Sequence, residues 1–309
     1  MKKNKINFAV ALLISGSSTI VNAQVAQKWM SSDIPAAWSS GYKGQGTTIT
    51  FVDDFSTAAS HKFSGNMNGS TQNQAHGYWT SEETKLVAPS ATIKTLDFNT
   101  TSNQSVTLAS KGLNVINMSY GIYVSGSALI PNLNIGTEQT SIVNISKAGS
   151  AVIAKAAGND GIPITFTSGN KVGFYASSNG VDYMNYALRG SPSALFVGAL
   201  NGNGSTTAKT SMAYYSNTAG TDAVVQSHFL SVGVNSTQMA GLAGTSFAAP
   251  IVSGYSAILG SKFTTATPTV IVNQLLNTAR TDTISNYSAA VYGKGEASLS
   301  RALSPVSIR

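Results

Sequence analysis

Residues 244–253 read Gly-Thr-Ser-Phe-Ala-Ala-Pro-Ile-Val-Ser, and no other stretch says as much about the chain. Small residues lead straight into an apolar segment, 247–259, which predicts a buried helix that begins at Ser246. Pro250 is tolerated because it falls near the first turn, where its missing N–H costs little. The hydroxyl and N–H of Ser246 would lie at the positive end of the helix dipole, where an acyl-transfer nucleophile needs them. A simple helix cap has the same pattern, so both interpretations stay open here.

The order of the candidate catalytic residues narrows the choice of enzyme class. The chain has three histidines, and all of them precede Ser246: His61, His76 and His228. That order excludes the α/β-hydrolases, in which the histidine follows the serine. Residues 47–53 read as a β-strand that ends in the carboxylate of Asp53, and a polar loop separates this strand from His76. An Asp-His-Ser order therefore fits best, although counting alone also allows His-Asp-Ser.

A set of motifs is spread over nearly all of the chain. In chain order these are residues 49–53, Ala75-His76-Gly77, Val87-Ala88-Pro89, residues 115–121, residues 156–160, Gly244-Thr245-Ser246 with Pro250, and residues 292–295. Together they resemble the subtilisin-like serine proteases, the subtilases. The resemblance implies an α/β fold of the subtilisin type, in which helices cover both faces of a mostly parallel β-sheet and so give three layers.

The resemblance also implies a role for each site residue. Ser246 would attack a peptide carbonyl, His76 would move the proton, and Asp53 would orient the imidazole. The side chain of Asn159 and the N–H of Ser246 would form the oxyanion hole. On this interpretation the chain is a serine endopeptidase that works through an acyl-enzyme intermediate.

A substrate-binding strand is implied as well. Ser119, Tyr120 and Gly121 resemble the family's strand that lines the substrate cleft, so an extended substrate would pair with its edge. The partners are then proteins or peptides. His61 is interpreted as structural, and His228 as a residue of the surface or the cleft rim.

The chain departs from the family beside two motifs. Asp54 and Phe55 follow Asp53 where the family has Ser or Thr and then Gly, and Tyr78 and Trp79 follow the His-Gly pair. These changes motivate an alternative, a weak or inactive protein of the same fold that binds its partner without cleaving it. A second alternative is an esterase that uses the same triad.

The N-terminus predicts export. Lysines at positions 2, 3 and 5 precede an apolar run over residues 8–14, and Ala23 ends a small-residue cleavage site. Residues 1–23 therefore read as a bacterial Sec-type signal peptide, and the mature protein is expected to be secreted or periplasmic. Of 19 basic residues three lie in this segment, which leaves 16 against 12 acidic ones, a net charge of +4. Such a mild, dispersed charge argues against a nucleic-acid partner.

Other classes of site are excluded by what the sequence lacks. The chain contains no cysteine, so thiolate catalysis, disulfides and cysteine-ligated zinc are ruled out. It has no HExxH motif either, so no catalytic metal is expected. No cofactor is needed for the implied reaction. Structural calcium stays open, since subtilases often bind it but no acidic loop here has a recognisable ligand spacing.

The mature chain, residues 24–309, is expected to form one peptidase domain and to act as a monomer. No membrane span is expected in it, because no later segment reaches about 20 apolar residues. Strands alternate with helices, as in a parallel sheet covered on both faces. The expected strands are 47–53, 91–96, 114–118, 151–156 and 194–199. The expected helices are 103–111, 138–148, 245–260 and 268–279.

Overall fold

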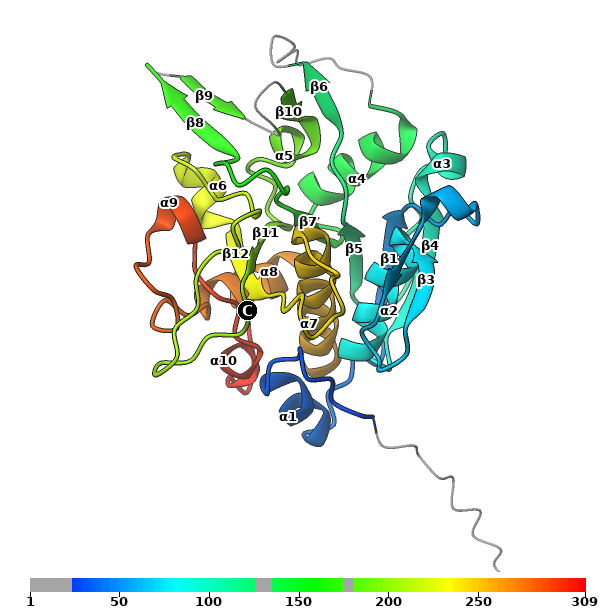
Figure 1. Cartoon of the computed structure of the whole chain (residues 1–309), viewed down its shortest axis with the longest axis vertical. Coiled ribbons are helices and arrows are strands. Elements are labelled where there is room, and N and C mark those ends of the chain that lie inside the picture. Colours follow the sequence, from blue (N-terminus) through cyan, green and yellow to red (C-terminus); the bar gives the residue numbers. More distant parts are fainter. Residues whose placement is uncertain (1–23, 126–134, 170, 175–179) are drawn as a thin grey trace, which may run out of the picture.

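A sheet of six parallel strands forms the centre of the computed structural model, which describes residues 24–125, 135–169, 171–174 and 180–309 (Figure 1). The order in the sheet is β12-β11-β7-β5-β1-β4. Along the chain the strands are β1 (Thr48–Asp53), β4 (Thr92–Asp97), β5 (Asn114–Met118), β7 (Val152–Ala156), β11 (Ala194–Leu200) and β12 (Phe229–Gly233). All five predicted strands are confirmed to within one residue at each end. The edge strand β12 is not among them.

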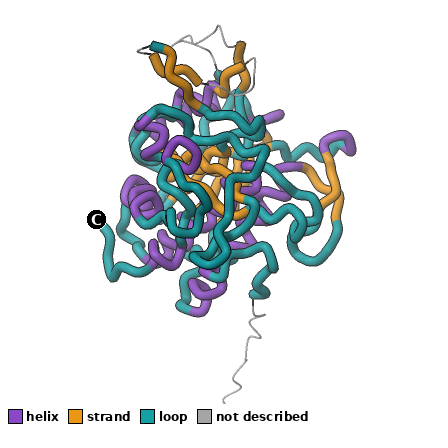
Figure 2. The backbone as a smooth tube through the Cα atoms, turned by 60° about the vertical axis from the view of Figure 1, so that its left-hand side comes forward, coloured by secondary structure: helices purple, strands orange, loops and turns teal. Residues whose placement is uncertain are grey.

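The sheet has a separate hydrophobic core on each face, as its alternating side chains require. On β1, Phe51 packs into the core that is shared with α2 (His76–Val87), α7 (Ala248–Lys262) and α8 (Pro268–Asn277). The next residue, Val52, packs into the core that is shared with α4 (Thr137–Lys147) and α5 (Tyr183–Ala187). Figure 2 shows the strands at the centre enclosed by helices and loops. The predicted three-layer α/β arrangement is therefore confirmed.

Helix α7 is buried on nearly all sides, with 14 of its 15 residues buried. This burial explains why its sequence is apolar all round and lacks a polar face. The helix does not begin at Ser246 as predicted. Thr245–Phe247 form a 3₁₀ turn, and the α-helix starts at Ala248, which places Pro250 in its first turn.

One predicted helix is wrong. Residues 103–111 are irregular, and only a short helix, α3 (Phe98–Thr101), lies before them. The side chain of Asn114 explains the difference, because it accepts from the N–H of Ala109 (2.8 Å) and donates to its carbonyl (3.0 Å). These bonds satisfy backbone groups that a helix would otherwise pair. The other two predicted helices, 138–148 and 268–279, are α4 and α8 to within two residues.

Short elements surround this framework. Three antiparallel pairs are β2 (Lys62–Gly65) with β3 (Gln72–Ala75), β6 (Tyr123–Ser125) with β10 (Gly180–Asp182), and β8 (Thr165–Ser168) with β9 (Lys171–Phe174). The remaining helices are α1 (Asp33–Ser39), η1 (Ala59–His61), α6 (Ala223–Ser227), α9 (Ala289–Tyr292) and α10 (Leu299–Leu303). In Figure 1, β6 and β10 lie at the top, where the chain continues from β5.

Two expectations about how the chain is divided stay predictions. The signal peptide, residues 1–23, lies outside the described residues. The assignment of residues 24–309 to a single peptidase domain is the second. Within the described ranges, no helix has both the length and the apolar character that a bilayer crossing requires.

Helix α2 carries a buried acid that costs stability. Glu83 is 0% exposed, and neither of its carboxyl oxygens has a hydrogen-bond partner among the described residues. Burial raises the pKa of Glu83 well above its usual value of 4.5. The folded chain therefore holds this proton to higher pH than the unfolded chain does. The free energy of unfolding must fall as the pH rises from about 4.5 toward the folded pKa.

We expect Glu83→Gln to make the protein more stable than the wild type at pH 7. We also expect it to weaken the fall of the free energy of unfolding with rising pH. The amide has nearly the same shape but no charge, and each pH unit within the window changes the free energy of unfolding by up to about 1.4 kcal/mol. Urea unfolding between pH 5 and pH 8 measures the effect. Glu82→Gln, at a more exposed neighbour, is the control and should change little. Equal slopes for wild type and Glu83→Gln would refute the explanation.

Candidate active site

The sequence-predicted site residues converge at one edge of the sheet. Asp53 ends β1, Ser119 directly follows β5, and Asn159 lies three residues beyond β7. These strands are neighbours and parallel, so their carboxyl ends meet at the same edge. The first residue of α2, His76, and the 3₁₀ turn that contains Ser246 reach the same edge and complete the set.

Asp53 is a buried carboxylate that is fully supplied with donors. It is 1% exposed, and its Oδ1 lies 2.6 Å from Nδ1 of His76 and accepts from the N–H of Asp54 (2.7 Å). Its Oδ2 accepts from the hydroxyl of Thr80 (2.9 Å). A carboxylate only accepts, so Nδ1 carries the proton and Nε2 is left as the basic nitrogen of the neutral ring. The Asp53–His76 contact therefore fixes both the tautomer and the direction of the imidazole.

Thr80 was missed in the sequence. It lies four residues after His76, one turn further along α2, and so falls on the same face of the helix. That spacing was a usable signal once His76 and Asp53 were taken as a pair. A hydroxyl one turn after the histidine is placed to bond the second oxygen of the same carboxylate.

The charge around His76 favours its protonated form. Burial lowers the pKa of His76, but the charge of Asp53, the hydrogen bond to Asp53 and the charge of Asp54 outweigh it, so the pKa is raised above 6.5. The rings of Phe63 and Phe247 lie 6.3 Å and 6.1 Å from the imidazole, centroid to centroid. His76 thus has the carboxylate of Asp53 at Nδ1 and an apolar ring on each of two neighbouring segments.

Ser246 is tied to the end of β5 by a reciprocal pair of hydrogen bonds. Its hydroxyl donates to the carbonyl of Ser119 (3.0 Å), and the hydroxyl of Ser119 donates to the carbonyl of Ser246 (2.9 Å). The buried amide of Asn117 in turn donates to the Ser119 hydroxyl (2.9 Å). In this state the Ser246 hydroxyl points to the strand rather than to His76.

Asn159 has its amide oriented by the residue before Ser246. Its Oδ1 accepts from both the N–H (2.7 Å) and the hydroxyl (2.9 Å) of Thr245. The same hydroxyl accepts from the N–H of Gly158 (3.0 Å). Among the described residues, Nδ2 of Asn159 has no hydrogen-bond partner, and the side chain is exposed. The amide can therefore present two N–H groups beside Ser246.

The loop that holds Asn159 is braced by Asn217, which sequence reasoning did not single out. Its buried side chain donates to the carbonyl of Ala157 (3.2 Å) and accepts from the N–H of Asp160 (3.0 Å). The approach is so close that a Cβ on Gly158, where φ is +116°, would lie 2.3 Å from Nδ2 of Asn217. Only glycine fits that position.

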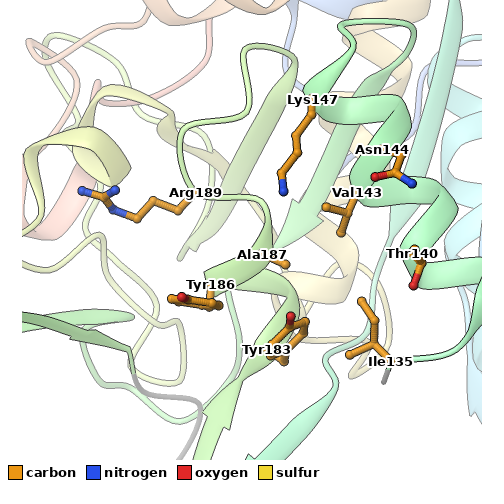
Figure 3. A pocket seen from close by; sticks show the side chains of 9 residues that line it. All are labelled: Ile135, Thr140, Val143, Asn144, Lys147, Tyr183, Tyr186, Ala187 and Arg189. Atoms are coloured by element: carbon orange, nitrogen blue, oxygen red, sulfur yellow. The ribbon is translucent and has the colours of Figure 1, made fainter. Parts of the chain in front are cut away.

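A small pocket opens directly at these residues. Its volume is about 50 Å³, and Ser119, Tyr120, Gly121, Asn159 and Ser246 all line it. The structure therefore brings the predicted substrate strand to the same hollow as the predicted nucleophile and oxyanion donor. A larger hollow of about 480 Å³ lies between α4 and α5 (Figure 3), but none of the predicted site residues lines it. The predicted substrate-binding residues therefore gather at the smaller pocket.

The other two histidines lie apart from this arrangement. His61 pairs with Asp54, with 2.6 Å between Nδ1 and Oδ2. His228 is half-buried at the end of α6, where Nδ1 contacts the Val224 carbonyl (3.2 Å) and the Ser227 hydroxyl (3.0 Å) of the same segment. In the described part of the chain, no three His, Cys, Asp or Glu side chains are grouped as metal ligands. Bound calcium stays untested.

The residues that depart from the family pattern leave the Asp53–His76 contact intact. Trp79 is buried in the core and donates its indole N–H to the carbonyl of Phe63 (3.2 Å). The hydroxyl of Tyr78 donates to the side chain of Gln72 (2.9 Å). Both side chains therefore pack α2 against the β2–β3 hairpin.

Comparisons with known proteins agree with this fold. The model of the subtilase family matches residues 46–295. The solved MycP3 protease from the type VII (ESX-3) secretion system is 17% identical, with a TM-score of 0.58, covering 88% of this chain and 86% of that one. MycP1 from Mycobacterium smegmatis is 18% identical, with a TM-score of 0.54 and coverages of 92% and 86%. A protease from Pseudoalteromonas arctica is 18% identical, with a TM-score of 0.52 and coverages of 88% and 93%. No curated protein matches the sequence.

We expect Asp54→Asn to lower the pKa of His76, because it removes one of the negative charges that favour the imidazolium. An NMR titration of the imidazole measures this directly, with resonances assigned through His61→Gln and His228→Gln variants. Asp97→Asn is the matched control, since this carboxylate ends the neighbouring strand β4 but does not contribute to the shift. If the pKa of His76 did not change in Asp54→Asn, or fell equally in Asp97→Asn, the electrostatic explanation would be wrong.

Proposed function

The chain belongs to the subtilase family of serine proteases, and on that basis we propose that Asp53, His76 and Ser246 form its catalytic triad. The observation that carries this proposal is the 2.6 Å contact between Oδ1 of Asp53 and Nδ1 of His76. It leaves Nε2 as the only ring nitrogen that can take a proton, at the edge of the sheet where Ser246 lies. The reaction is hydrolysis of peptide bonds in protein substrates.

Acylation begins with release of the Ser246 hydroxyl. An extended substrate that pairs with residues 119–121 presents a backbone N–H to the carbonyl of Ser119, which now accepts from Ser246. The displaced hydroxyl rotates toward His76. Its oxygen then attacks the substrate carbonyl while Nε2 of His76 takes its proton. Asp53 stabilises the imidazolium that results, and no proton passes to the carboxylate.

The tetrahedral intermediate places a negative charge on the former carbonyl oxygen. The N–H groups of the Asn159 side chain and the backbone N–H of Ser246 are the donors for it. Thr245 holds the Asn159 amide through its oxygen, so the donors are oriented before the charge forms. His76 then gives its proton to the leaving amine, which leaves an acyl group on Ser246.

Deacylation repeats the same proton movements with water. His76 takes a proton from a water molecule as that water attacks the acyl carbonyl, and the same two donors receive the oxyanion. The proton returns to the oxygen of Ser246 as the acyl bond breaks. The products are a free carboxylic acid and the regenerated enzyme.

The site of action follows from the N-terminal sequence. Residues 1–23 carry the lysines, apolar run and cleavage site of a signal peptide, so the mature enzyme acts in the periplasm or outside the cell. Neither alternative from the sequence is favoured by a feature of the site. Three residues motivated a non-catalytic binding protein. Tyr78 and Trp79 bond to the β2–β3 hairpin, and the ring of Phe55 packs against Gly77, so the Asp53–His76 contact is kept.

We expect Ser246→Ala to abolish peptide hydrolysis and labelling by a fluorophosphonate probe while the chain stays folded. The expected loss in kcat is on the order of 10⁶, the magnitude measured for such replacements in subtilisin, a member of this family. Ser39→Ala, at the exposed end of α1, is the control and should still be labelled. Substantial proteolysis by folded Ser246→Ala would refute the triad. Labelling of the wild type with hydrolysis of esters alone would favour the esterase.

We expect Thr80→Val to lower kcat by roughly 10- to 100-fold with little change in KM. The substitution keeps the shape of the side chain but removes a hydrogen bond to a charged group, worth about 1.5–3 kcal/mol. Thr80→Ser keeps the hydroxyl and should stay near the wild type. If the serine variant lost as much activity as the valine variant, Thr80 would only pack the helix and would not position Asp53.

A further inference from the structure

A buried ion pair closes the inner end of the small pocket beside Ser246. Nζ of Lys155 lies 2.7 Å from Oδ2 of Asp182, and both side chains line the pocket. Their side chains are only 1% and 4% exposed. Lys155 belongs to the central strand β7, and Asp182 ends the short strand β10. Ser246 and Asn159 line the same pocket but are more exposed, so we take the buried ion pair as its inner end.

The pair is held rigidly from several sides. Lys155 also donates to the carbonyl of Ala156 (2.5 Å). Oδ1 of Asp182 accepts from the backbone N–H groups of Ile122 (3.1 Å) and Met184 (3.0 Å). These bonds connect β7, the chain after β5 and the start of α5. Neither charged group can leave the pocket without leaving other buried polar groups unpaired.

The pair also lies hard against the predicted substrate strand. A Cβ built on Gly121 would meet Oδ2 of Asp182 at 2.7 Å, so the carboxylate touches the backbone there. Tyr123, which is 61% exposed, also lines the pocket. The space that remains is about 50 Å³, whereas a single water needs about 10–15 Å³. Only a short side chain fits in it.

We propose that Lys155 and Asp182 determine the cleavage specificity of this enzyme by restricting the residue at P1, whose carbonyl Ser246 attacks, to small uncharged side chains. The inference rests on the proposed function, because it requires that carbonyl to lie between Ser246 and Asn159. The side chain next to that carbonyl then enters the hollow that both residues line. Glycine, alanine and serine fit it.

Larger and charged side chains are excluded for different reasons. An aromatic or leucine side chain exceeds the free volume, and the bonded ion pair prevents the inner end from yielding. A charged side chain would lose its water and find a pair of opposite charges that already neutralise each other. The lysine therefore acts by filling and neutralising the pocket rather than by attracting an acidic residue.

The test compares peptide substrates that differ only at P1, with alanine, leucine, phenylalanine, lysine or glutamate. For the wild type we expect kcat/KM to be at least about 100-fold higher with alanine than with any of the other four. The variant Lys155→Ala/Asp182→Asn shortens the lysine and removes both charges together, and asparagine keeps an acceptor for Ile122 and Met184. It should bring phenylalanine and leucine to within about 10-fold of alanine.

Two controls keep the outcomes distinct. Lys155→Met/Asp182→Asn removes the charges but keeps the volume, so the preference for alanine over phenylalanine should persist. Arg189→Ala/Asp222→Asn breaks another ion pair, which does not line this pocket, and should leave the profile unchanged. Fluorophosphonate labelling of Ser246 reports separately on the catalytic centre. An unlabelled wild type would refute the proposed function, whereas a labelled one that cleaves after phenylalanine as well as after alanine would overturn only the specificity proposal.

An unchanged P1 profile in folded, labelled Lys155→Ala/Asp182→Asn would also overturn the specificity proposal. If that variant does not fold, the wild-type profile and the methionine variant decide the question. Loss of the alanine preference in the methionine variant would show that charge, and not volume, sets the specificity, against the proposal.

Discussion

A carboxylate shut away from water keeps its charge only where donors replace the water that it has lost. Asp53 meets this condition at the end of strand β1, where His76, Thr80 and the N–H of Asp54 supply its oxygens with donors. Two of these donors come from α2, so the carboxylate fixes where that helix starts relative to the sheet. The arrangement raises the pKa of His76 despite burial of the ring, because the neighbouring negative charges outweigh the loss of water. The position of the proposed base thus depends on one buried charge.

The rest of the site follows from the parallel sheet. Neighbouring strands end at one edge, and each brings one proposed function there: Asp53 at the end of β1, the proposed substrate strand after β5 and Asn159 after β7. Helix α7, buried all round, holds Ser246 against this edge through the bonds to Ser119. The same edge also carries the specificity that we propose, since Lys155 is in β7, only four residues before Asn159. Catalysis and selection of substrate therefore share one rigid support.

Asp53, His76, Asn159 and Ser246 each lie in a local motif beside the end of a regular element, and the structure brings these motifs to one edge of the sheet. Their catalytic roles stay predictions. The sequence was insufficient where a contact joins distant segments. Asn217 braces the chain near Gly158, and nothing local marks it as different from other polar loop residues. Lys155 is a single charge within an apolar strand, and its partner Asp182 is known only from the fold. The helix predicted at 103–111 failed for the same reason. The side chain of Asn114, which bonds the backbone of Ala109, lies outside the segment from which the helix was predicted.

The most direct test of this account is the crystal structure of the enzyme with a peptide boronate that ends in an alanine analogue. We expect the boron to be bonded to Oγ of Ser246, with one boronate oxygen about 2.7–3.1 Å from Nδ2 of Asn159. The peptide should lie along residues 119–121, with an N–H bonded to the carbonyl of Ser119, and the methyl group should point toward Lys155 and Asp182. A boronate bonded to another residue, or an oxygen directed away from Asn159, would contradict the account.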